Sequence, residues 1–110
     1  MPINNRRHDI TSSTARIDVD PARIQLAQRV VEAIEARGLT QAAAAALLGI
    51  DQPKVSRLLR NRLSEFSVSR LMRFITILGR DVEIVIHAAR EDTPEQQGRL
   101  RVVATSRTGL

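Results

Sequence analysis

The chain has 110 residues, with 17 Lys and Arg against 12 Asp and Glu, no cysteine, and a formal net charge of +5. This length suits one small domain with terminal segments, and the absence of cysteine excludes disulfides and thiolate metal sites. The longest apolar run, residues 42–50, is far shorter than the roughly 20 residues of a membrane span, and we expect no signal peptide. The positive charge favours a polyanionic partner through counterion release, although charge alone does not identify that partner.

Residues 1–19 are rich in Asn, Ser, Thr and charged residues and show no sustained hydrophobic period. This composition predicts a flexible N-terminal arm. Four apolar residues are scattered along it, and a partner that orders the arm would contact them: Ile3, Ile10, Ile17 and Val19. The alternative is a disordered start with no binding role.

Asp20 and Pro21 predict the start of the first helix, because Asp is a favoured N-cap and Pro is favoured at the first helical position. Apolar residues then recur at spacings of three and four, which predicts one buried stripe made of Ile24, Ala27, Val30, Val31 and Ile34. Gly38 is expected to end the helix. We expect this helix to support the two that follow and assign it no chemistry.

Residues 40–60 predict a helix, a tight turn and a second helix. Thr40 is a suitable N-cap, residues 41–48 favour a helix, and Gly49 is expected to end it. Asp51 then caps a new helix with Pro53 in its first turn. So short a turn makes the helices cross steeply, and narrow apolar stripes suit that contact: Ala44, Ala45 and Leu48 on the first helix, and Val55, Leu58 and Leu59 on the second. This is helix-turn-helix geometry, in which the second helix enters the DNA major groove.

Polar side chains on the outside of the second helix are suited to reading DNA. Amides pair with adenine, Arg and Lys pair with guanine, and all of them can contact phosphate. The candidate DNA-binding residues on and just after this helix are Gln52, Pro53, Lys54, Ser56, Arg57, Arg60, Asn61 and Arg62. Gln41, at the N-terminus of the preceding helix, is a candidate phosphate anchor. The alternative is that these residues form ordinary solvated helix faces.

Ser67 predicts the start of a fourth helix, which Gly79 ends. It holds more apolar residues than one stripe needs, so it is either the central core helix or partly an interface with a second subunit. Residues 20–80 would form the helix-turn-helix domain.

From Asp81 onward the hydrophobic period changes to an alternation that predicts a strand. The strand needs a partner, either residues 100–104 or the same strand in a second copy, and we expect both in a small sheet shared across a homodimer. The expected dimerisation residues are Val82, Ile84, Val85 and Ile86. Residues 81–104 would form this β segment, and residues 105–110 a frayed tail. A twofold dimer would place two recognition helices about 34 Å apart on a palindromic operator.

Enzyme chemistry finds no support in the sequence. Neither His8 nor His87 has a neighbouring Cys, Ser or carboxylate pair at the spacing of a triad or a metal site. Acidic residues in 81–95 are expected to be solvated, and there is no Gly-rich phosphate loop. We predict no catalytic residue, no metal and no cofactor.

Two stretches resemble the XRE-type helix-turn-helix regulators: residues 39–49 (LTQAAAAALLG) and 51–60 (DQPKVSRLLR). Three others are similar to the HigA-like antitoxin branch of that family: residues 63–67 (LSEFS), 71–74 (LMRF) and 78–86 (LGRDVEIVI). The resemblance covers about residues 22–104. It implies a mainly α fold, a helical bundle with a helix-turn-helix. To this the alternating pattern after Asp81 adds a small C-terminal β strand or hairpin that pairs across a dimer.

The resemblance also implies a function. The chain would be a sequence-specific repressor that binds double-stranded DNA and the antitoxin of a type II toxin-antitoxin pair, neutralising an mRNA-cleaving toxin and repressing its own operon. In such antitoxins a segment outside the helical core often binds the toxin, which makes residues 1–19 a candidate. The alternative is a stand-alone XRE-type regulator with no toxin partner. Either function would place the protein in the cytoplasm, associated with the nucleoid through DNA.

Overall fold

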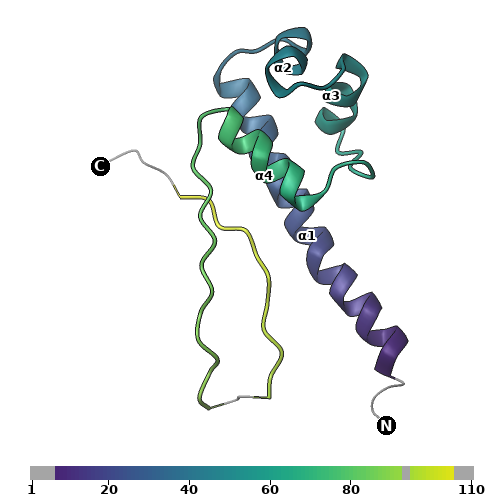
Figure 1. Cartoon of the computed structure of the whole chain (residues 1–110), viewed down its shortest axis with the longest axis vertical. Helices are drawn as coiled ribbons and strands as arrows, with labels where there is room; N and C mark the ends of the chain where they lie inside the picture. The colour runs from purple at the N-terminus through teal and green to yellow at the C-terminus, as the bar shows by residue number, and fades with distance from the viewer. Residues whose placement is uncertain (1–6, 93–94, 106–110) are drawn as a thin grey trace.

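Helices supply the regular secondary structure of residues 7–92 and 95–105, the part of the chain that the computed structural model describes. The helices are α1 (Arg7–Ala36), α2 (Gln41–Leu48), α3 (Gln52–Leu59) and α4 (Val68–Ile77). The C-terminal half of α1 packs along α4, and α2 packs on α3 at one end of this pair (Figure 1). This arrangement confirms the mainly helical fold with a helix-turn-helix.

Side chains cap the N-termini of three helices at the predicted positions. Thr40, Asp51 and Ser67 stand immediately before α2, α3 and α4 in extended backbone conformation. Each side-chain oxygen accepts a hydrogen bond from the backbone N–H three residues later, at 2.8–3.1 Å. Such a cap contributes about 1 kcal/mol because it satisfies a donor that the helix leaves unpaired. The chain is therefore divided into helices by local signals.

Left-handed residues end all four helices. Gly38, Gly49 and Gly79 follow α1, α2 and α4 with φ of 63°, 74° and 95°, as the sequence predicts. Asn61 does the same for α3 with φ of 60°, and the next N–H, that of Arg62, donates to the carbonyl at the start of the last turn at 2.8 Å. Asn tolerates this conformation better than other side chains do. The backbone of Asn61 therefore has a structural role that its side chain did not reveal.

The start of α1 differs from the prediction. The helix begins at Arg7, so Asp20 is not its N-cap and Pro21 lies inside it. Residues 7–19, expected as a flexible arm, have helical backbone, whereas residues 1–6 lie outside the described residues. The Asp-Pro pair is typical of a helix start because an internal proline costs about 3 kcal/mol. No Gly or Pro stands between residues 7 and 20 to stop the helix, however, and it continues through Pro21.

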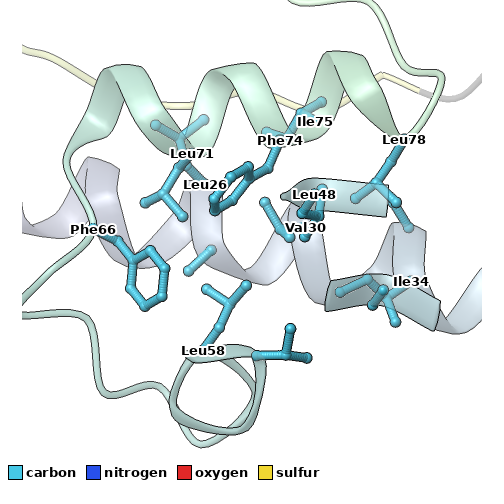
Figure 2. Packing of buried hydrophobic residues seen from close by; sticks show 14 of the residues in the cluster. Leu26, Val30, Ile34, Leu48, Leu58, Phe66, Leu71, Phe74, Ile75 and Leu78 are labelled. Carbon is cyan, nitrogen blue, oxygen red and sulfur yellow. The ribbon is translucent and has the colours of Figure 1, made fainter. Parts of the chain in front are cut away.

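The core lies between α1, α4 and the α2–α3 pair (Figure 2). Val30 of α1, Leu58 of α3 and Leu71 of α4 are at most 1% exposed, and Phe66 from the α3–α4 loop is equally buried. The buried stripe of α1 is shifted from the predicted one, because Ile24 is 39% exposed and Leu26 takes its place. The half-buried apolar residues of α4 pack against this core as well, which supports the interpretation of α4 as the central core helix.

The C-terminal segment, residues 81–105, contains no strand among its described residues, so the expected strand or hairpin is not supported. Among the described residues, backbone hydrogen bonds outside the helices fall between residues 33 and 80, and none joins residues 82–86 to residues 100–104. The alternating pattern predicts extended backbone correctly, but a strand also needs ladder partners, and the described chain provides none. The segment leaves the helices and returns to them as an open loop (Figure 1).

Near its two ends this loop contacts the helices through two packed side chains and one hydrogen bond. Val82 and Val102 pack against the core, and the backbone N–H of Val102 donates to Oε1 of Gln25 on α1 at 3.1 Å.

Within the described part of the chain, no helix is long and apolar enough to cross a membrane.

Candidate nucleic-acid interface

The contact between α2 and α3 is apolar, as predicted. Ala44, Ala45 and Leu48 are the buried residues of α2, and Val55 and Leu58 are those of α3. Ile50, in the turn between them, is half-buried against the same core. The small alanines allow a close approach of the two helices, and the larger side chains of α3 fill the space behind it. This packing fixes α3 relative to the rest of the domain and leaves its opposite face in solvent.

The N-terminal part of α3 presents polar groups to that solvent. Gln52 and Pro53 are exposed, and Lys54, Ser56 and Arg57 are half-buried. Helix α3 carries five of the predicted residues, Gln52, Pro53, Lys54, Ser56 and Arg57, and Val55 and Leu58 of the same helix are buried. Between residues 52 and 62 the chain has four cations and no acidic residue. An exposed helix with this set of donors can bind phosphates and the edges of bases.

The remaining predicted residues lie at other points around α2 and α3. Gln41 is exposed in the first turn of α2, where the unpaired N–H groups of the helix suit an anion. Arg60, Asn61 and Arg62 are exposed beyond the C-terminal end of α3, at the opposite end from Gln52. This separation suits them to the DNA backbone, because recognition helices read bases mainly through their N-terminal residues.

An ion pair between α3 and the α3–α4 loop was not predicted. Nε of Arg57 donates to Oε2 of Glu65, which stands in the α3–α4 loop. Arg23 of α1 donates through Nη1 to the carbonyls of Leu63 and Phe66 at 3.3 and 3.4 Å. These contacts join residues from different elements, in the case of Arg23 forty or more positions apart, so no local periodicity reveals them. The sequence does show many arginines, but their number does not indicate which residues they contact.

The predicted dimerisation residues do not share one environment. Val82 is half-buried against the core, whereas Ile84, Val85 and Ile86 are 72%, 62% and 90% exposed. His87 is exposed next to them. Within the described residues, no group of three or more His, Cys, Asp or Glu is arranged to hold a metal ion.

Comparisons with known proteins agree with this geometry. The family described as "Helix-turn-helix domain" matches residues 8–87, which include α2, α3, α4 and all of α1 except its first residue. A solved structure named as an XRE family transcriptional regulator is 38% identical, with a TM-score of 0.69, and the alignment covers 83% of this chain and 98% of that one. Comparison with curated protein sequences gives no match. The chain therefore belongs to the XRE-type helix-turn-helix family of DNA-binding transcriptional regulators, which is not a class of enzymes.

Proposed function

We propose that this regulator is a sequence-specific repressor that inserts α3 into the major groove of its operator. The observation that supports the proposal is the accessible polar N-terminal part of α3, where Gln52 and Pro53 are exposed and Lys54, Ser56 and Arg57 are half-buried. Buried Val55 and Leu58 hold this helix against the core. A repressor needs such a rigid helix, because a mobile one would lose its conformational entropy on binding. Occupation of a promoter by this helix blocks transcription without any further chemistry.

The candidate residues divide into two roles under this proposal. Gln52, Lys54, Ser56 and Arg57 read base edges, while Pro53 adds apolar surface at the same end of the helix. Phosphate contacts come from Gln41, Arg60, Asn61 and Arg62, which lie around the two ends of the helix-turn-helix. The first group sets sequence preference, and the second sets register, affinity and salt dependence.

A homodimer is part of the proposal. One recognition helix covers only a few base pairs, whereas two related by a twofold axis read both halves of a palindromic operator. The exposed apolar residues of the C-terminal segment support this, since Ile84, Val85, Ile86, Leu100 and Val103 are between 53% and 90% exposed. An extended segment with unpaired backbone groups and apolar side chains is suited to pair with another chain. The same segment of a second copy is the proposed occupant.

We further propose that the regulator is the antitoxin of a type II pair. The support is the resemblance of residues 63–67, 71–74 and 78–86 to HigA-like antitoxins. The N-terminal half of α1 extends past the other helices (Figure 1), so a toxin could bind it while α3 remains accessible to DNA. The second candidate function is a stand-alone regulator without a toxin, which the helix-turn-helix itself supports equally well.

Co-expression with the product of the adjacent gene tests the proposal, followed by co-purification and a promoter-binding assay at two salt concentrations. Co-purification together with a salt-sensitive shift of its own promoter supports both roles. A shift without a retained partner leaves the stand-alone regulator. No shift of that promoter by the pure chain, or by the complex, would contradict autorepression.

A further inference from the structure

The loop between α3 and α4 is fixed to the helices on both sides. Nη1 of Arg23, on α1, donates hydrogen bonds to the loop carbonyls of Leu63 and Phe66, at 3.3 and 3.4 Å. The side chain of Phe66 is 1% exposed, and its ring meets that of Phe74 on α4 edge to face at 6.1 Å. A loop with a buried aromatic anchor and bound carbonyls has little freedom left to lose.

Arg70 of α4 adds a further attachment. Its guanidinium lies over the rings of Phe66 and Phe74, 5.7 and 5.6 Å from their centroids, and Nη1 donates to the carbonyl of Glu65 in a long hydrogen bond of 3.5 Å. Glu65 therefore lies in a loop segment that contacts with α1 and α4 hold in place. Its carboxylate has a fixed position relative to α3.

The carboxylate of Glu65 holds one of the candidate DNA-reading residues. It accepts a hydrogen bond from Nε of Arg57, whose side chain remains 38% exposed. Engagement of Nε leaves the two terminal nitrogens, Nη1 and Nη2, which form the end that can pair with O6 and N7 of guanine. A guanidinium held in this way loses less rotamer freedom when it meets a base than an untethered one.

The other cations near α3 differ from Arg57. Among the described residues, no carboxylate forms an ion pair with Lys54, Arg60 or Arg62. Pairing with Glu65 also neutralises the charge of Arg57, which weakens its attraction to phosphates of any sequence. Both effects act in the same direction: they reduce non-specific binding and favour a contact of fixed geometry.

We infer that Glu65 is a positioning residue that orients Arg57 toward a guanine and thereby sets sequence specificity rather than affinity. This inference rests on the proposed reading of DNA through α3. Glu65 itself contacts no base, and it acts only through the guanidinium that it holds.

The test compares Glu65→Ala with Glu32→Ala in the full chain. Glu32 lies on α1 and pairs with Arg29 and Arg80 at 2.9 and 3.8 Å, so its removal costs the same negative charge at a site away from α3. The probes are a duplex selected from a random pool by the wild-type chain and a scrambled duplex of equal composition. The readout is the ratio of the two dissociation constants at one salt concentration, with thermal unfolding as a check of folding.

We expect Glu65→Ala to lower this ratio about tenfold, which corresponds to about 1.4 kcal/mol, while Glu32→Ala leaves it within about twofold. Glu65→Gln, which retains an acceptor oxygen, should recover most of the loss. Repeating the selection with Glu65→Ala should relax the preference for guanine at one position of each half-site. In an Arg57→Ala background, Glu65→Ala should have no further effect on the ratio.

Equal ratios for Glu65→Ala and Glu32→Ala would overturn the inference, as would a loss that persists in the Arg57→Ala background. Arg57→Ala and Lys54→Ala separate this failure from that of the proposed function. If Arg57→Ala and Lys54→Ala both bind the two duplexes as the wild type does, the proposal that α3 reads DNA is wrong, and so is the proposed role of Glu65. If either lowers the ratio while Glu65→Ala does not, only the role of Glu65 is wrong.

Discussion

The helical body, residues 21–80, and the C-terminal segment, residues 81–105, are both rich in apolar residues with a regular period, yet of their described residues only those of the body form regular secondary structure. A helix satisfies its backbone groups within itself and needs neighbours only for its apolar stripe. An extended segment needs a partner for its backbone as well. The comparison shows that an alternating pattern specifies a conformation without specifying where its hydrogen bonds go, whereas a helical pattern with its caps specifies both.

The largest effect should come from the same truncation made in each region. Leu71 is 0% exposed in the body and Leu100 is 53% exposed in the segment. Leu71→Ala should lower the free energy of unfolding by about 2–5 kcal/mol, because it leaves a cavity in the core. Leu100→Ala should change it by less than about 0.5 kcal/mol in dilute solution. Urea denaturation monitored by circular dichroism measures both, and similar losses would show that the segment belongs to the folded core.

A charged face on the C-terminal segment should break the dimer without unfolding the body. The double variant Ile84→Lys and Ile86→Lys places two cations where the proposed partner copy packs. We expect light scattering to show a monomer, and binding to a full palindrome to fall about 100-fold with binding to a half-site unchanged. Glu91→Gln with Asp92→Asn changes the charge of the same segment equally and should retain the dimer. A wild-type chain that is already monomeric would contradict the proposed interface.

Replacing one glycine in each region by alanine should give a smaller difference in stability between the two regions. Gly49, in the turn before α3, has φ of +74°, and a Cβ added there meets no atom within 4 Å, so its substitution tests the backbone alone. Gly49→Ala should cost about 1–2 kcal/mol of stability, because the left-handed conformation is unfavourable for alanine. Gly98→Ala, in the segment, should change stability by less than about 0.5 kcal/mol. Thermal unfolding measures the stability of both variants. Equal unfolding temperatures for Gly49→Ala and Gly98→Ala would contradict the left-handed conformation of Gly49.

The smallest effect concerns the salt dependence of DNA binding. Arg60→Ala and Arg62→Ala should each reduce the slope of log K against log salt by about 0.9, the contribution of one phosphate contact. Arg99→Ala and Arg101→Ala, in the C-terminal segment, should leave the slope unchanged if only the body contacts DNA. Fluorescence anisotropy over a range of salt concentrations gives these slopes. Equal reductions in the two regions would mean that the segment also lies against the duplex.

Local signals predicted the caps Thr40, Asp51 and Ser67 and the terminal glycines, because capping depends on residues within one turn. The apolar contact of α2 with α3 was predicted for the same reason. Three features were not predicted: the extension of α1 to Arg7, the absence of a strand in the described C-terminal segment, and the Arg57–Glu65 pair. The strand and the ion pair depend on what the chain meets elsewhere in the fold, which neither spacing nor composition specifies. The extension of α1 follows from the lack of a helix-breaking residue between 7 and 20, which the start signal at Asp20 and Pro21 concealed. The site residues of α3 and their roles at DNA stay predictions.

Pro21 gives α1 a mechanical property. Because its ring has no N–H, Pro21 cannot donate the helical hydrogen bond to the carbonyl four residues earlier, and the helix on either side is joined by one such bond fewer. Buried residues begin immediately after it, with Ala22 only 2% exposed. The first half of α1 therefore joins the body through a turn that lacks one backbone hydrogen bond. We expect a partner that binds this half to affect α3 only if it also contacts the body.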